Sequence, residues 1–178
     1  MKQENDLSVR LRPWAEGDSP LLARLMGDPE MTKYLGGPED SEQLARRHQR
    51  YVALTDSGKG QMFVIVGGDQ QEPVGSVGYW ETEWQGRLVW ETGWSVLPEF
   101  QGQGIATKAT VAVVEQARAQ GKHRFIHAFP SVDNGASNAV CRKAGFTLAS
   151  EVEFESWRVP GQIIRFNDWR LDLSLVAE

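Results

Sequence analysis

The sequence predicts a single domain of the α+β class, in which helices pack on one sheet. Three observations support this prediction. The chain has 178 residues, enough for one sizeable core and too few for two. Apolar residues recur with a period of two in some segments and with helical spacing in others. These segments follow the order β-α-α-β-β-β-α-β-α-β-β without a repeat or a low-complexity linker, so we assign residues 1–178 to one domain.

Six segments in the first half of the chain have the periodicity of a strand or a helix. We expect a strand at 7–12, helices at 18–27 and 41–54, and strands at 62–66, 73–79 and 88–97. Asp18 is placed to act as the N-cap of the first helix, and Pro13 follows the first strand as its end. Gln85 and Gly86 lie between the last two strands, which predicts that these strands form a hairpin.

The second half begins with the strongest helical pattern in the sequence. Residues 106–120 place Ala109, Val113 and Ala117 on one face, and Gly121 follows as a stop signal. After this helix we expect a strand at 125–129, a short helix at 136–144, and strands at 146–154 and 163–173. These elements complete the predicted sheet and its covering helices.

Composition and charge argue against several classes of protein. Hydrophobic residues make up 40% and charged residues 24% of the chain, as in an ordinary globular protein. The net charge of -5 argues against a nucleic-acid surface and is compatible with a cationic substrate such as an amine. Cys141 is the only cysteine, so neither an internal disulfide nor a thiolate metal cluster can form, and the scattered histidines indicate no metal site. Without an export signal or an apolar run of ~18 residues, we expect a cytoplasmic protein that does not enter a membrane.

Segment 96–106, which joins a strand to the strong helix, is the most informative motif. Gly102 and Gly104 allow the backbone to approach a ligand without a Cβ in the way. The N–H groups that enter the helix have no partner within it, and the helix dipole adds partial positive charge there. These features predict a binding site for a diphosphate.

Three kinds of phosphate-binding loop compete for this pattern. A Walker A loop needs Gly-Lys-Ser/Thr at the helix start, where this chain follows Gly104 with two apolar residues. A dinucleotide-binding loop needs a third small residue, where Thr107 stands, and a ribose-binding acid on the next strand, where 125–129 has none. The third kind is the Gln/Arg-x-x-Gly-x-Gly/Ala loop of the GNAT acetyltransferases, which residues 101–106 resemble. A plain tight turn between strand and helix is the alternative.

Four segments together resemble the RimJ/RimL branch of the GNAT family. They read VRLRPW from residue 9, DPE and YLG between residues 28 and 36, ETGWSV leading into the glycine loop, and NGAS leading to a Gly-Phe pair at 145–146. The resemblance extends from about residue 7 to residue 173. It implies a three-layer fold, in which helices cover both faces of a mixed, mostly antiparallel sheet whose two central parallel strands splay apart.

The resemblance also implies where acetyl-CoA, the acyl donor, would bind. The strands ending at Val96 and Phe129 would splay, and the pantetheine arm would pair with the backbone near Val96. Loop amides would hold the diphosphate, and side chains of the next helix would contact the cofactor. The loop residues are Gln101, Gly102, Gln103, Gly104, Ile105 and Ala106, and the helix residues are Asn134, Asn138 and Arg142. An N-cap role for Asn134 and a solvated surface charge at Arg142 are the alternatives.

Direct attack of an amine on a thioester requires a base, a donor to the carbonyl oxygen and a proton for the leaving thiolate. Glu91 is the candidate base, because it lies on the strand face opposite the largely apolar face of Trp90 and Trp94; an exposed glutamate or a buried ion pair is the alternative. The resemblance implies that the Val96 N–H is the oxyanion donor. It also implies that Ser137 lies near the thioester sulfur, unless Ser137 is only a helix cap.

One departure from the family pattern concerns the leaving thiolate. Cys141 occupies the position of the usual general-acid tyrosine, and we favour a packing role for it. His127, on the strand beside the proposed gap, is an alternative base or a structural histidine. A second class of function therefore stays open: an idle GNAT-like module that binds acyl-CoA or a partner without acyl transfer. A nucleotide-binding domain unrelated to CoA is a third interpretation.

The sequence does not identify the acceptor amine. The resemblance implies that residues 28–51 and 151–168 shape the acceptor pocket. Aromatic walls suited to a cation would come from Tyr34, Trp80, Trp84 and Trp157. Core packing and a dimer surface are the alternatives for these residues, and a homodimer stays open. Candidate acceptors are a protein N-terminal amine, a small amino acid, a polyamine or an aminoglycoside.

Overall fold

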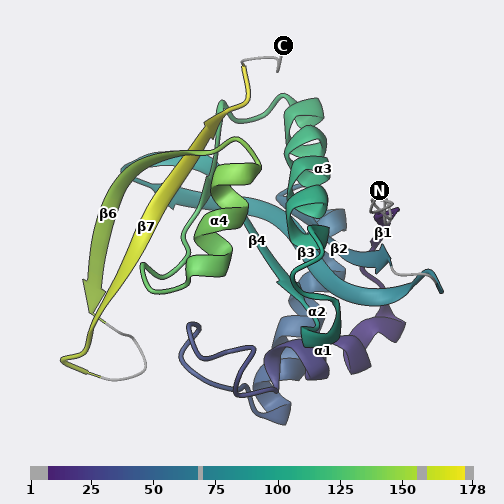
Figure 1. Cartoon of the computed structure of the whole chain (residues 1–178). Coiled ribbons are helices and arrows are strands. Elements are labelled where there is room, and N and C mark those ends of the chain that lie inside the picture. Colours follow the sequence, from purple (N-terminus) through teal and green to yellow (C-terminus); the bar gives the residue numbers. More distant parts are fainter. Residues whose placement is uncertain (1–7, 68–69, 156–159, 175–178) are drawn as a thin grey trace, which may run out of the picture.

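A seven-stranded sheet forms the centre of the computed structural model, which describes residues 8–67, 70–155 and 160–174 (Figure 1). All neighbouring strands are antiparallel except β4 and β5, which are parallel, so the predicted mixed sheet is confirmed. In spatial order the strands are β1 (Arg10–Pro13), β2 (Gly60–Gly67), β3 (Glu72–Trp84), β4 (Arg87–Val96), β5 (Phe125–Ala128), β7 (Ile163–Asp172) and β6 (Thr147–Glu155).

Helices cover both faces of this sheet. Helices α3 (Ile105–Gln120) and α4 (Gly135–Lys143) lie in front of the sheet in Figure 1, and α1 (Ser19–Met26) and α2 (Ser41–Ser57) lie on the other side, toward β2. Short 3-10 turns precede α1 (Glu16–Asp18) and follow β4 (Pro98–Phe100). The order of elements is the one expected from the sequence. None of the helices in the described ranges has the length and apolar character needed to cross a membrane.

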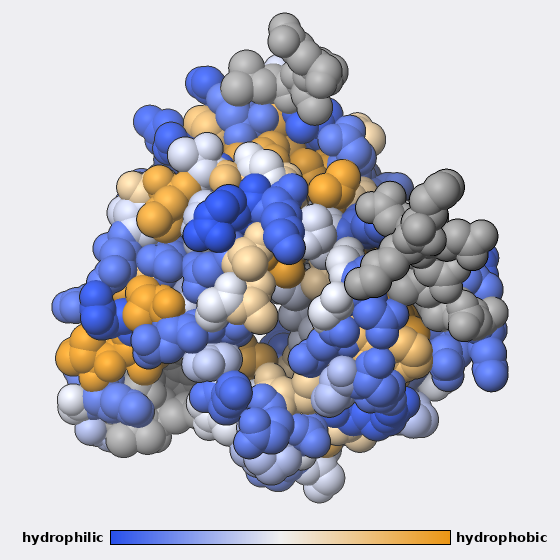
Figure 2. Space-filling view, in the orientation of Figure 1, coloured by the Kyte–Doolittle hydropathy of each residue, from blue (hydrophilic) through white to orange (hydrophobic). Residues whose placement is uncertain are grey.

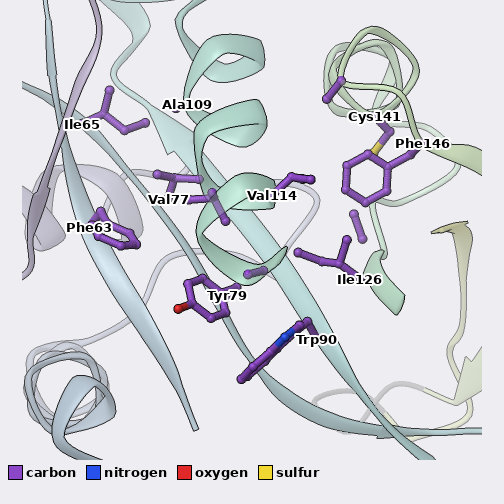
Figure 3. Packing of buried hydrophobic residues seen from close by; sticks show 14 of the residues in the cluster. Phe63, Ile65, Val77, Tyr79, Trp90, Ala109, Val114, Ile126, Cys141 and Phe146 are labelled. Carbon is purple, nitrogen blue, oxygen red and sulfur yellow. The ribbon is translucent and has the colours of Figure 1, made fainter. Parts of the chain in front are cut away.

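The larger core lies between α3 and the sheet. Figure 3 shows Val77, Tyr79, Trp90 and Ile126 beside α3, with Cys141 approaching from α4. Each fully buried aliphatic side chain of this kind stabilises the fold by about 1.5–3 kcal/mol. The second core lies under α1 and α2 and is built from residues of the opposite parity on β2. Alternation along β2 thus separates the two faces.

The parallel pair at the centre of the sheet is short. Strands β4 and β5 pair only at Trp90 with Ile126 and at Glu91 with His127. Beyond these positions β4 continues to Val96 without a partner on the β5 side. The Leu97 N–H donates to the Val74 carbonyl (2.9 Å), and bonding alternates along an antiparallel ladder, so the Val96 N–H and carbonyl point toward β5.

Several element boundaries differ from the predicted ones. Pro13 was expected to follow the first strand but is the last residue of β1. Residue 7, the predicted start of this strand, lies outside the described residues. Asp18 precedes α1 but does not cap it, because its carboxylate binds the Arg12 guanidinium and the Ala15 N–H. The hairpin turn is at Gln85 and Gly86, as predicted, and positive φ angles of 51° and 75° there allow β3 to run five residues further.

Candidate active site

The glycine loop has the backbone geometry expected of a phosphate-binding site. Gly102 and Gly104 have φ angles of 73° and 77°, in the left-handed region that glycine adopts most easily. Apart from the adjoining residues, no atom of the described part of the chain lies within 4 Å of the position that a Cβ would take at either residue. The loop surface is therefore open, and any side chain would project into the space above its amides.

The amides of this loop lead into α3. The helix begins at Ile105, one residue earlier than predicted, and no side chain caps its N-terminus. Its first turn therefore presents unpaired N–H groups and the positive end of the helix dipole. This is an electrostatic environment suited to an anion.

A cleft of about 620 Å³ opens at the same place. Figure 2 shows a hollow near the centre of the face that is turned toward the viewer. The cleft is lined by the end of β4, the glycine loop, the first turn of α3, residues of α4 from Gly135 to Lys143, and the loop after α1. From the sequence-predicted cofactor set it includes Val96, Gln101, Gly102, Gly104, Ile105, Ala106 and Asn134.

Gln101 and Gln103 have different positions although they are neighbours in the motif. The Gln101 side chain turns back and donates to the Val96 carbonyl (2.8 Å), so it occupies one of the two backbone groups that point toward β5. Gln103 does not line the cleft, and its amide donates to the Glu99 carbonyl (3.4 Å). Only Gln101 could therefore meet a donor bound along β4.

The α4 side of the cleft contains two of the predicted residues. The Asn134 side chain accepts from the Ser137 N–H (3.0 Å) and caps α4, and both residues also line the cleft. The cap interpretation of Asn134 therefore holds together with its place at the site. The cap on the helix is Asn134 and not the Ser137 hydroxyl, which leaves that hydroxyl available to a ligand.

Two other α4 residues do not line the cleft. Asn138 is buried, its amide group donates to the Ser131 and Asn134 carbonyls, and its side-chain oxygen accepts from Asn167 and Trp169. The exposed guanidinium of Arg142 lies 5.5 Å from the centre of the Trp169 ring. Neither residue is therefore placed to contact a donor bound in the cleft. Lys143 lines the cleft instead, and the sequence carried no signal that distinguished it from other surface lysines.

Glu91 lies on the sheet face opposite α3, as its position in the alternating pattern predicts. Its partner across the ladder with β3 is Trp80, whose ring lies over Gly93, where a Cβ would meet it at 3.0 Å. Glu91 does not itself line the cleft, whose β4 residues are Trp94, Ser95 and Val96. Burial raises the pKa of the Glu91 carboxyl, while hydrogen bonding with Thr82 and Trp80 and the charge of His127 act in the opposite direction. A carboxyl with a raised pKa is suited to accept a proton near neutral pH.

His127 is held in a buried network on this same face. Its Nδ1 lies 2.7 Å from Asp168 Oδ1, and the Trp84 Nε1–H donates to Asp168 Oδ2 (3.0 Å). The side chains of His127 and Asp168 are 6% and 4% exposed. Sequence reasoning identified His127 as an alternative base but missed Asp168, which is 41 residues away.

Cys141 lies in the core and not in the cleft. It is fully buried between α3 and β7, and burial raises the pKa of its thiol to about 12. This position agrees with the packing role expected for it.

The remaining wall of the cleft comes from the loop after α1. Glu30, Met31, Lys33, Tyr34 and Leu35 contribute to it. Of the four aromatic residues predicted for an acceptor pocket, Tyr34 lines the cleft. Trp80 and Trp84 lie on the sheet face that carries Glu91, and Trp157 lies outside the described residues.

Comparison with known proteins agrees with this geometry. Residues 8–147 match the family profile described as an acetyltransferase (GNAT) domain. The chain belongs to the GNAT acetyltransferase family. This GNAT protein is 30% identical over 139 residues to the uncharacterized N-acetyltransferase YoaA of Bacillus subtilis, covering 76% of this chain and 77% of YoaA. It is thus an enzyme of the acyl-CoA-dependent N-acetyltransferase class.

Solved structures share the fold of this GNAT protein. The spermidine N-acetyltransferase of Vibrio cholerae, in complex with CoA and spermine, has a TM-score of 0.76 at 18% identity, with 93% of this chain and 96% of that chain covered. The Salmonella typhimurium acetyltransferase that modifies the N-terminal serine of ribosomal protein L7/L12 has a TM-score of 0.75 at 23% identity, with 93% and 95% covered.

Proposed function

We propose that this GNAT protein transfers the acetyl group of acetyl-CoA directly to a primary amine. One observation carries the proposal: Gly102 and Gly104 open the uncapped start of α3 onto the cleft, beside the point where β4 and β5 diverge. The diphosphate would lie on the amides of residues 101–106, and the pantetheine arm would run along the β5 side of β4. The donor thus enters between the two strands.

Three groups would serve the reaction. Glu91 would accept a proton from the incoming ammonium, directly or through water, because its carboxyl is partly buried and has a raised pKa. The Val96 N–H, which points toward β5, would donate to the carbonyl oxygen as negative charge develops. The Ser137 hydroxyl, at the first turn of α4, would protonate the departing thiolate.

The acceptor we propose is a protein N-terminal amine or a small amine. The similar Vibrio cholerae structure contains spermine, and the similar Salmonella enzyme modifies an N-terminal serine. In this chain Glu30 and Tyr34 line the cleft and already hold one ammonium group, because Lys33 Nζ lies 3.7 Å from the Glu30 carboxylate and 5.2 Å from the centre of the Tyr34 ring. Membership of the RimJ/RimL branch and a cytoplasmic location remain predictions, and so does a homodimer.

A thiol-release assay with acetyl-CoA and a panel of amines tests the proposal. We expect turnover with at least one amine, and a loss of ~10²–10⁴ in kcat for Glu91→Gln, the range for removing an acid-base group. Glu83→Gln is the matched control, because Glu83 is an exposed glutamate on the neighbouring strand β3. CoA binding without turnover across the whole panel would identify the idle module, and absence of CoA binding would refute both functions.

A further inference from the structure

Acetylation of an ammonium group releases two protons from the nitrogen. One must leave before the amine can attack the thioester carbon, and the second leaves after the C–N bond has formed. The departing thiolate takes up one proton when the C–S bond breaks, so one proton remains to be removed in each turnover. A single carboxylate such as Glu91 holds one proton at a time, so a second acceptor behind it would free it for the next proton.

The structure places a histidine directly beside Glu91. His127 is the residue paired with Glu91 in the parallel β4–β5 ladder, at the last position before the two strands diverge. Partners in a ladder project from the same face of the sheet, and here it is the face opposite α3. The two side chains interact electrostatically, because positive charge on His127 favours the charged form of Glu91.

Asp168 fixes the orientation of this imidazole. It accepts from His127 Nδ1 on one oxygen and from the Trp84 indole on the other, so both carboxylate oxygens act as acceptors. His127 Nδ1 must then carry a hydrogen, so in the neutral imidazole the lone pair is on Nε2. The Phe129 ring stacks on the imidazole with centroids 5.8 Å apart, which holds its plane as well.

Among the described residues, charged groups face His127 from both neighbouring strands. Asp168 faces it from β7 and Glu91 faces it from β4. Its ladder partner Arg170 is exposed, and that guanidinium lies 4.8 Å from the centre of the Phe125 ring. The side chains near His127 on its own strand are the rings of Phe125 and Phe129. Two carboxylates, one on each neighbouring strand, therefore flank the imidazole.

We propose that His127, oriented by Asp168 and Trp84, takes the proton from Glu91 and so returns this base to its carboxylate form within each turnover. The inference rests on the proposed acetyl transfer and on Glu91 as its base. Because His127 acts through Glu91 and does not touch the substrate, it is a positioning residue that also carries a proton.

The proton balance of the step is closed. The substrate ammonium gives a proton to Glu91, whose carboxylic acid passes it to His127 Nε2, and the resulting imidazolium keeps its Nδ1–H bond to the Asp168 carboxylate. Glu91 then accepts the second nitrogen proton after attack. The Ser137 hydroxyl gives its proton to the leaving thiolate and regains one from the Glu91 carboxylic acid through water, while the imidazolium releases the other proton to solvent. The enzyme thus returns to its starting state.

Steady-state kinetics of His127→Asn tests the relay. The asparagine amide can still donate to Asp168 but cannot take up a proton. We expect kcat to fall by ~10–100-fold, with the KM for acetyl-CoA unchanged and with kcat rising as imidazole buffer is added at constant pH. Trp84→Phe is the control that disturbs the same network without removing the proton acceptor, and its smaller loss should not respond to imidazole.

A kcat of His127→Asn within twofold of wild type, or a loss that imidazole leaves unchanged, would overturn the relay. If Glu91→Gln is inactive in that case, the proposed function still stands; if the wild type acetylates no amine, the function itself fails. Should His127→Asn not fold, the ¹⁵N spectrum of the wild-type imidazoles decides the question. Protonation of His127 on Nδ1 alone in the free enzyme supports the relay, and protonation on Nε2 alone refutes it.

Discussion

Replacing Gly104 by alanine separates a ligand-binding role of the glycine loop from a plain turn. An alanine at φ 77° costs roughly 1–2 kcal/mol of strain, and beyond its chain neighbours its methyl group meets no atom of residues 8–67, 70–155 or 160–174 within 4 Å. Gly121 offers a matched control at the other end of α3, with φ 61° and equally open surroundings, but it does not line the cleft. Both variants should therefore lose about 2–8 °C in Tm, since ~1 kcal/mol corresponds to about 2–4 °C in a chain of this size.

CoA should distinguish the two variants. At a concentration 100 times Kd, CoA stabilises a protein by about 2.7 kcal/mol, which raises Tm by roughly 5–11 °C. The Gly104→Ala methyl group projects into the space of the diphosphate, and we expect Kd to increase ~100-fold, two steps of about 1.4 kcal/mol. The same CoA concentration would then add only about 0.4 kcal/mol, roughly 1 °C.

Thermal unfolding with and without CoA, together with titration calorimetry, measures these differences. Gly121→Ala should keep the full CoA-dependent increase of the wild type. If Gly104→Ala keeps it too, the loop is only a turn between β4 and α3, and the proposed donor site must be abandoned.

Three further predictions concern single side chains. Because burial raises the pKa of Glu91, ionisation of this carboxyl lowers the stability of the fold as pH rises above the ordinary glutamate pKa of 4.5. Glu91→Gln should therefore have a higher Tm than wild type at neutral pH, and the difference should vanish below pH ~4. A pH series of thermal melts checks both expectations. Ser137→Ala should lower kcat by ~10–100-fold with Tm unchanged, since Asn134 supplies the cap of α4; an equal fall in Tm would assign Ser137 a structural role instead. Cys141, with a pKa of about 12, should react with an aromatic disulfide reagent only after unfolding, and Cys141→Ala should keep kcat far from the ~10²-fold loss expected of a general acid.

Local signals in the sequence predict most of the fold. Gly86 marks the β3–β4 turn and Gly121 marks the end of α3, because a left-handed backbone conformation at both positions favours glycine. Asp18 shows where local reasoning fails. Its N-cap role was wrong, since Arg12 and the Ala15 N–H compete for the same carboxylate.

The candidate site could be predicted only where a motif is continuous in the chain. The glycine loop is such a motif, and its two glycines have the predicted open geometry. The partnership of His127 and Asp168 depends on β5 lying next to β7, and no local pattern fixes that adjacency. The burial of Asn138 depends likewise on Trp169, which donates to its side-chain oxygen from β7.

The two-residue contact between β4 and β5 has a mechanical consequence. Few backbone hydrogen bonds join the two halves of the sheet there. We therefore expect the packing of Ile126, Val114 and Cys141 in the core to set much of the spacing between β4 and β5. A substitution that changes the volume of one of these three side chains should alter the width of the gap between β4 and β5, where the thioester would bind. Such a substitution would change the KM for acetyl-CoA from within the hydrophobic interior, at a residue that never contacts the donor.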